Sequence, residues 1–224
     1  MDGGPTLLVG HSYGGPVITG AGRATNVVGL VYLAAFAPAQ GESLNSILAS
    51  SDPAPGLASI SPAFDDDFLW HRQDTFHDAF CQDLDYTESL VMATTQRPLA
   101  RRCFEDVTGE PAWNTKPSWY QVSAQDRMIP PQTQRKMAER IHARETIELD
   151  TSHASFATRP TQVLELITNA AAPVPDPTQN TSVVRRGRRF PPCRRGSCPR
   201  SASSRRHAGA PARSRRRAAL PRCC

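Results

Sequence analysis

The sequence predicts an α/β fold in which a parallel sheet is covered by helices. Short apolar runs of strand type alternate along the chain with helical segments, as a parallel sheet with crossover helices requires. Four such runs precede residue 172, and the first two form a strand–helix–strand unit. Because the composition changes at residue 173, we expect one folded domain, residues 1–172, and a separate tail, residues 173–224.

The strand–helix–strand unit lies at the N-terminal end. Residues 6–9 form an apolar run that is too short for a helix and stops at Gly10, which predicts a buried strand. A helix is expected over residues 13–24. Residues 26–33 are nearly all apolar and rich in β-branched side chains, so they predict the second strand.

Residues 38–115 predict a helical insertion, or lid, and no sheet. The segment is rich in Asp, Pro and Ser, and the loosely amphipathic stretches at 86–96 and 98–104 favour helices. Three aromatic side chains of this segment either line an apolar pocket or form the core of the lid: Phe68, Trp70 and Trp113.

The regular alternation returns after the lid. Residues 119–122 and 145–149 predict two further strands, and residues 130–143 and 160–172 predict the helices that follow them. The apolar residues of both helices recur at helical spacing, so each is expected to pack one face on the sheet.

The tail carries the positive charge of the chain. It holds 14 arginines and one acid, a net charge of +13, whereas the first 172 residues have a net charge of −8. The folded domain is therefore not expected to bind nucleic acid. The Arg/Pro/Ser-rich tail cannot bury enough apolar surface to fold, so we expect it to be disordered. Its composition indicates an out-of-frame gene end or, alternatively, a basic arm that binds nucleic acid or acidic surfaces.

The remaining sequence features favour a soluble protein. No apolar run approaches the roughly 20 residues of a membrane helix, and no signal peptide follows Met1. Cys81 and Cys103 are isolated and predict no disulfide framework. We therefore expect a cytoplasmic protein that does not bind membranes, and the sequence leaves its oligomeric state open.

Residues 10–14 read Gly-His-Ser-Tyr-Gly, a G-x-S-x-G motif with a predicted strand before it and a helix after it. This is the setting of a nucleophile elbow, in which a serine is exposed on a strained turn. Ser12 is the candidate nucleophile, and the backbone N–H of Tyr13 is the candidate oxyanion donor at the helix N-terminus. The alternative is a glycine-rich turn with an inert serine.

A serine nucleophile needs a base, and the base needs an acid that orients it. Asp126 lies between the third predicted strand and a helix, and His153 follows the fourth strand. Both residues therefore lie at the strand ends where such a site is built. Taken alone, Asp126 could be a turn acid and His153 a surface residue, but three such residues in the order Ser, Asp, His favour a catalytic triad.

Five other polar residues are weaker candidates. His142 falls inside a predicted helix and is expected to face solvent, while His71 and His77 lie in the lid. Asp150 lacks the loop-then-helix setting, and His11 is expected to pack beneath the site. No His/Cys cluster of the folded domain has the spacing of metal ligands, so we expect neither a metal nor another cofactor.

Together these motifs resemble bacterial α/β-hydrolases of the small esterase type, akin to the plant hydroxynitrile lyase and methylesterase group. The resemblance covers about residues 5–172 and rests on the segments 10–18, 30–38, 117–120, 128–131 and 152–154, with Asp126. It implies cofactor-free hydrolysis of small-molecule esters, in which Ser12 attacks, His153 moves the proton and Asp126 holds the imidazole. The group also contains lyases with the same triad, so the reaction type stays open.

The resemblance also implies an incomplete sheet. In this family an N-terminal half precedes the strand before the serine and supplies several strands and the second oxyanion donor. Only five residues precede Thr6 here, so we expect missing N-terminal strands, an open edge at the first strand and weakened catalysis. Three functions stay open: a serine hydrolase of small esters, a catalytically silent fragment, and an interaction protein that acts through its tail.

Overall fold

The computed structural model describes residues 4–172. The predicted disorder of residues 173–224, and the basic-arm hypothesis with it, therefore lie outside the described residues. Within the described part no helix is long and apolar enough to cross a membrane.

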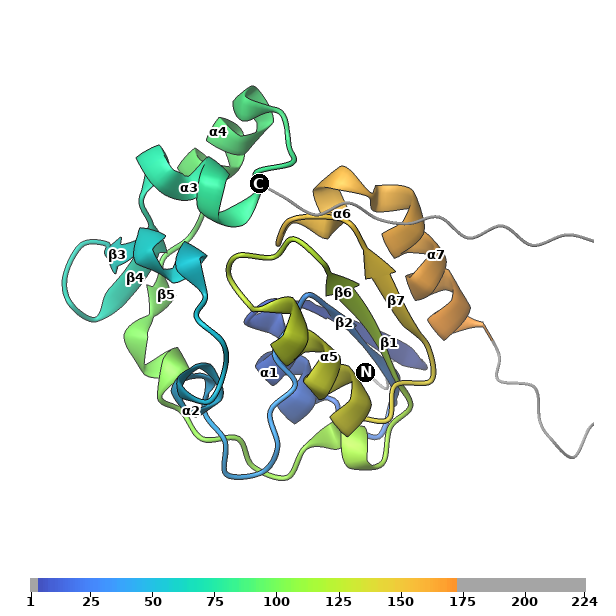
Figure 1. Cartoon of the computed structure of the whole chain (residues 1–224). Coiled ribbons are helices and arrows are strands. Elements are labelled where there is room, and N and C mark those ends of the chain that lie inside the picture. The colour runs from blue at the N-terminus through green and yellow to red at the C-terminus, as the bar shows by residue number, and fades with distance from the viewer. Residues whose placement is uncertain (1–3, 173–224) are drawn as a thin grey trace, which may run out of the picture. The chain divides into compact units, whose positions relative to one another are not determined.

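A four-stranded parallel sheet forms the centre of the domain and confirms the predicted α/β fold (Figure 1). Its strands follow the spatial order β1-β2-β6-β7. Their bounds are Thr6–His11 for β1, Val27–Leu33 for β2, Ser118–Ser123 for β6 and Thr146–Leu149 for β7. The two inner strands are almost wholly buried, which explains why they read as continuous apolar runs. Among the described residues β1 pairs only with β2, so the strand that leads to Ser12 has an open edge, as expected.

Helices cover both faces of this sheet. Helices α1 (Gly14–Ala21) and α5 (Pro131–Arg140) pack on one face, and α7 (Pro160–Ala171) packs on the other. Successive residues of β2 alternate between the two cores, because neighbouring side chains of a strand point to opposite faces. Leu30 and Tyr32 belong to the α1/α5 core, whereas Val31 and Leu33 belong to the α7 core.

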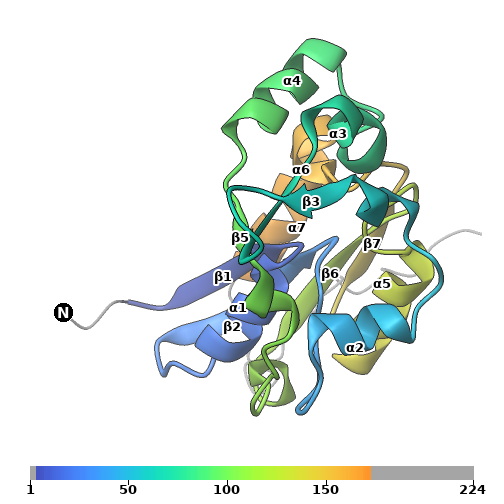
Figure 2. The ribbon, with the colours of Figure 1, turned by 90° about the vertical axis from the view of Figure 1, so that its left-hand side faces the viewer.

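The lid lies between β2 and β6 and is built from short helices and a second, smaller sheet. Figure 2 shows α3, α4 and β3 above the four-stranded sheet. The helices are α2 (Leu44–Ala49), α3 (Gln73–Phe80) and α4 (Tyr86–Thr95), with 3-10 turns at Pro55–Ser59, Arg101–Phe104 and Ala112–Asn114. The strands are β3 (Ile60–Pro62), β4 (Phe68–His71) and β5 (Leu99–Ala100), which pair antiparallel in the order β3-β4-β5. The predicted helical character of the lid is confirmed, and the short α6 (Ser155–Thr158) follows β7.

The expectation that the lid contains no sheet was wrong. Its three strands have three, four and two residues, too few to show an alternating pattern in the sequence. The helix expected at 98–104 was also wrong, because β5 and a 3-10 turn occupy that stretch. Leu99 pairs with Leu69 across the small sheet, and Ala100 has an extended backbone, so the first part of this stretch cannot be helical.

Candidate active site

Ser12 occupies a sharp turn between β1 and α1. Its φ of 53° lies in the left-handed region, which is uncommon for a residue with a side chain and marks local strain. The turn is held from two sides, since the carbonyl of Ser12 accepts hydrogen bonds from the N–H groups of Gly15 (3.0 Å) and Phe36 (3.2 Å). These features are the backbone geometry of a nucleophile elbow.

Gly10 and Gly15 make this turn possible. The motif itself contains Gly10 and Gly14. A Cβ at Gly10 would lie 2.6 Å from the carbonyl oxygen of Gly14, and a Cβ at Gly15 would lie 1.9 Å from that of Phe36. A Cβ at Gly14 would meet nothing within 4 Å. Close backbone approach therefore requires glycine at positions 10 and 15, whereas position 14 has room for a side chain.

Asp126 lies in the loop between β6 and α5 and is buried. Its Oδ1 accepts hydrogen bonds from the backbone N–H groups of Met128 (2.7 Å) and Ile129 (3.0 Å). Its Oδ2 accepts from the Gln134 side chain (2.7 Å) and from Nδ1 of His153 (2.7 Å). Four donors thus hold the carboxylate in one orientation, and each of its oxygens has two partners.

His153 follows β7 and its side chain is completely buried. Because Nδ1 bonds to Asp126, the other ring nitrogen, Nε2, is the atom left for chemistry. That Nε2 is buried and has no hydrogen-bond partner among the described residues. The structure therefore brings Asp126 and His153 together, while no hydrogen bond joins Ser12 to His153 in the described part of the chain.

Aromatic rings pack around the His153 imidazole. The centroids of His11 and Phe80 lie 4.6 Å and 4.7 Å from it, and Phe156 packs against His11 at 4.9 Å. Nε2 of His11 donates to the backbone carbonyl of His153 at 2.9 Å. Burial, and then the nearby charge of His153, lower the pKa of His11 to about 3, so its ring is neutral near pH 7. His11 therefore packs against the imidazole of His153, in agreement with the prediction that it packs beneath the site.

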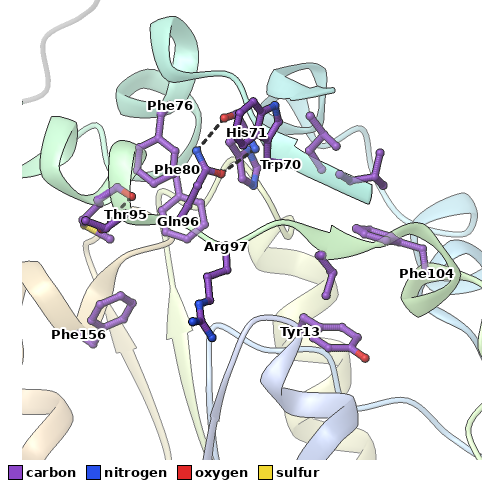
Figure 3. A pocket seen from close by; sticks show the side chains of 14 residues that line it. Tyr13, Trp70, His71, Phe76, Phe80, Thr95, Gln96, Arg97, Phe104 and Phe156 are labelled. Carbon is purple, nitrogen blue, oxygen red and sulfur yellow. Dashed lines mark hydrogen bonds between the residues drawn. The ribbon is translucent and has the colours of Figure 1, made fainter. Parts of the chain in front are cut away.

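A cavity of about 400 Å³ lies between the lid and the elbow (Figure 3). Its walls are largely aromatic and apolar, with Tyr13 at the elbow end and Phe156 from α6. The lid contributes most of the remaining side chains, among them Ile60, Leu69, Trp70, His71, Phe76, Phe80, Met92, Arg97, Leu99 and Phe104. A concave apolar site of this size is typical of small-molecule pockets.

The three aromatic residues singled out from the sequence have different roles. Trp70 lines the cavity, whereas Phe68 is exposed. Trp113 packs against the α1/α5 core and donates its indole N–H to the carbonyl of Pro38 at 3.1 Å. Only Trp70 therefore belongs to the cavity.

Tyr13 contributes to the site through both its backbone and its ring. Its N–H begins the first turn of α1 and has no backbone acceptor among the described residues, so it is available to an oxyanion. Its ring lines the cavity. Hydrogen bonding to Cys103 and then burial raise the pKa of the Tyr13 hydroxyl to about 12.

Of the other candidates, Asp150, His142 and His77 do not line the cavity, whereas His71 does. Asp150 accepts a hydrogen bond from the exposed Gln125 side chain, and His142 is exposed just beyond α5. Nε2 of His77 lies 3.1 Å from the carbonyl of Leu84. His71, the other lid histidine, lines the cavity. No cluster that could hold a metal ion occurs in residues 4–172.

The model of the alpha/beta hydrolase family matches residues 1–166 of this chain. The chain belongs to that family. Solved structures with the same fold include a pyrethroid hydrolase from Sphingobium faniae JZ-2, at 22% identity and a TM-score of 0.62. That match covers 76% of this chain and 72% of the other. Polyneuridine aldehyde esterase aligns at 16% identity with a TM-score of 0.63, over 77% of this chain and 74% of the other. At these identities the likeness establishes the fold alone.

The sequence of this chain is similar to that of the carbendazim hydrolyzing esterase of Nocardioides sp. (strain SG-4G). The two proteins are 51% identical over 60 residues, which make up 26% of this chain. The match spans only 25% of the length of that esterase.

Proposed function

We propose that this family member is a serine hydrolase that cleaves small esters with the triad Ser12, Asp126 and His153. The observation that carries the proposal is the buried pair of His153 and Asp126, whose Nδ1 and Oδ2 lie 2.7 Å apart. The other ring nitrogen of His153, Nε2, has no partner among the described residues. A buried nitrogen without a partner costs free energy, which a catalytic hydrogen bond would recover.

The steps follow from the orientation of these groups. Ser12 Oγ attacks the ester carbonyl while Nε2 of His153 takes its proton, and Asp126 stabilises the imidazolium through Nδ1. The Tyr13 N–H donates to the oxyanion that forms. His153 then protonates the leaving alcohol, and a water molecule, activated by the same Nε2, releases the acid from Ser12.

Ester hydrolysis is favoured by the names of the relatives and by the cavity. One relative is called a carbendazim hydrolyzing esterase, and the structural neighbours include a pyrethroid hydrolase and an esterase. The aromatic cavity of about 400 Å³ next to Tyr13 suits a small, largely apolar ester. No metal or other cofactor enters this mechanism.

A catalytically silent protein is the second candidate. It is favoured by the missing hydrogen bond between Ser12 and His153 and by the open edge of β1 among the described residues. Catalytic hydrogen bonds are often long in ligand-free structures, so this geometry does not decide against catalysis.

Turnover of p-nitrophenyl acetate and p-nitrophenyl butyrate by the full chain tests the proposal. We expect Ser12→Ala to reduce turnover to the background rate. Ser61→Ala, at a hydroxyl that forms no hydrogen bond within residues 4–172, should leave it unchanged. Equal turnover in Ser12→Ala and the native protein would exclude Ser12 as the nucleophile. Background rates in the folded native protein would favour the silent alternative.

A further inference from the structure

Several polar side chains that line the cavity already have partners within the protein. The Thr95 hydroxyl donates to the carbonyl of Val91 at 2.7 Å. The Gln96 amide bridges the backbone of His71, accepting from its N–H and donating to its carbonyl, each at 2.8 Å (Figure 3).

His71 is committed as well, and it carries no charge near pH 7. Its Nδ1 lies 2.6 Å from the Ser59 hydroxyl, which itself lies 2.7 Å from the carbonyl of Gly56. Burial, and secondarily the charge of His153, lower the pKa of His71 to about 4. The imidazole therefore cannot supply a positive charge to a ligand in this cavity.

Among the described residues that line the cavity, Arg97 is the one with a permanently charged side chain. It lies in the short connection between α4 and β5, and in Figure 3 its side chain extends from the lid toward the elbow, between Phe156 and Tyr13. Within residues 4–172 it has neither an ion-pair partner nor a side-chain hydrogen bond. A guanidinium group carries five N–H donors and keeps its charge at any ordinary pH.

We propose that Arg97 binds the carboxylate of a ligand whose apolar body lies among the aromatic side chains of the cavity. A guanidinium group recognises a carboxylate through two parallel hydrogen bonds, which is the strongest polar contact that this cavity can offer. The substrate class that fits is a half-ester, a molecule of moderate size with one ester, one free carboxylate and an apolar or aromatic core. That the ligand carries an ester follows from the proposed function, on which this part of the inference rests. Tyr13, the residue after Ser12, lines the same cavity.

Binding of a matched pair of compounds tests the carboxylate site without relying on catalysis. Monoethyl terephthalate carries the carboxylate, and ethyl 4-carbamoylbenzoate replaces it with a neutral amide of similar shape. We measure both dissociation constants by titration calorimetry on the full-length Ser12→Ala protein, which cannot consume them. The carboxylate compound should bind about 10- to 100-fold more tightly, as expected for a hydrogen bond to a charged group.

Variants of Arg97 test whether the preference for the carboxylate compound depends on this residue. Arg97→Gln in the same Ser12→Ala protein should remove the preference and leave the affinity for the amide unchanged, and Arg97→Lys should keep part of it. Arg23→Gln is the matched control, because Arg23 forms an exposed ion pair with Glu110 and does not line the cavity. Equal affinities for the two compounds, no binding of either, or a preference that survives Arg97→Gln would overturn the proposal.

Turnover of the same two esters by the native chain separates this inference from the proposed function. If both hold, kcat/KM favours monoethyl terephthalate, and Arg97→Gln abolishes this preference. If neither ester is cleaved but the Arg97-dependent binding persists, the hydrolase proposal fails and the carboxylate site stands.

Discussion

The four-stranded sheet and the lid differ in how completely the polar side chains at the candidate site are satisfied. On the side of the sheet, the Asp126 carboxylate receives four hydrogen bonds and is buried. On the side of the lid, Arg97 is exposed and has no side-chain partner among the described residues. Fixed groups suit chemistry, because catalysis needs a preorganised geometry. A charged group without a partner suits ligand recognition. We infer that the sheet supplies the reaction and the lid selects the ligand.

The largest loss of activity is expected from a change at Asp126, whose carboxylate accepts four hydrogen bonds. Asp126→Asn should reduce kcat/KM for p-nitrophenyl butyrate by about 10³- to 10⁴-fold, because the amide can no longer hold the His153 tautomer that leaves Nε2 free. Asp150→Asn is the control, since its carboxylate is exposed and bonds only to Gln125 among the described residues. If both variants lost activity equally in ester turnover assays, the assignment of Asp126 as the orienting acid would fail.

The turn that carries Ser12 should be the next most sensitive point. Gly15→Ala should lower the free energy of unfolding by about 3 kcal/mol, because its Cβ would overlap the Phe36 carbonyl. Gly14→Ala should change it by less than about 1 kcal/mol, since that Cβ meets open space. Urea unfolding of both variants measures the difference, and similar values would mean that the turn is less constrained than the structure indicates.

A smaller loss of folding stability is expected from His71 of the lid at acidic pH. The pKa of His71 is about 4 in the folded protein and about 6.5 in an unfolded chain, so the unfolded state takes up a proton first as the pH falls. This histidine should therefore remove at most about 3 kcal/mol of stability between pH 6.5 and pH 4, and none above pH 7. His71→Asn should flatten the pH dependence of urea unfolding over that window. His142→Asn, at an exposed histidine, should leave it unchanged; equal slopes for both variants would contradict the account.

The sequence predicts the sheet well because strands buried on both faces must be apolar throughout. The bounds of β2 and β6 agree with the predicted runs to within a residue. Asp126 and His153 could be singled out because parallel strands bring their carboxyl ends to one edge, so position along the chain implies position in space. The hydrogen bond between them was expected for the same reason.

The lid was predicted less well because its structure depends on contacts between distant segments. Its strands are too short to carry a pattern, and the cavity joins residues as far apart as Tyr13 and Phe156. Arg97 was missed because no local signal distinguishes an arginine that lines a cavity from one that faces solvent. Phe76 and Phe80 did offer a signal, since aromatic residues four apart share one face of a helix.

Covalent labelling of the full chain by a fluorophosphonate tests the central claim most directly, because the reagent reacts with activated serines and peptide mass spectrometry locates the product. The account predicts modification of Ser12, abolished in His153→Ala and retained in His142→Asn. Ser59 is the other serine that we compare, since its hydroxyl also lies next to a histidine, 2.6 Å from Nδ1 of His71 in the lid. Labelling at Ser59, or labelling of Ser12 that persists in His153→Ala, would contradict the assignment of Ser12 and His153 as nucleophile and base.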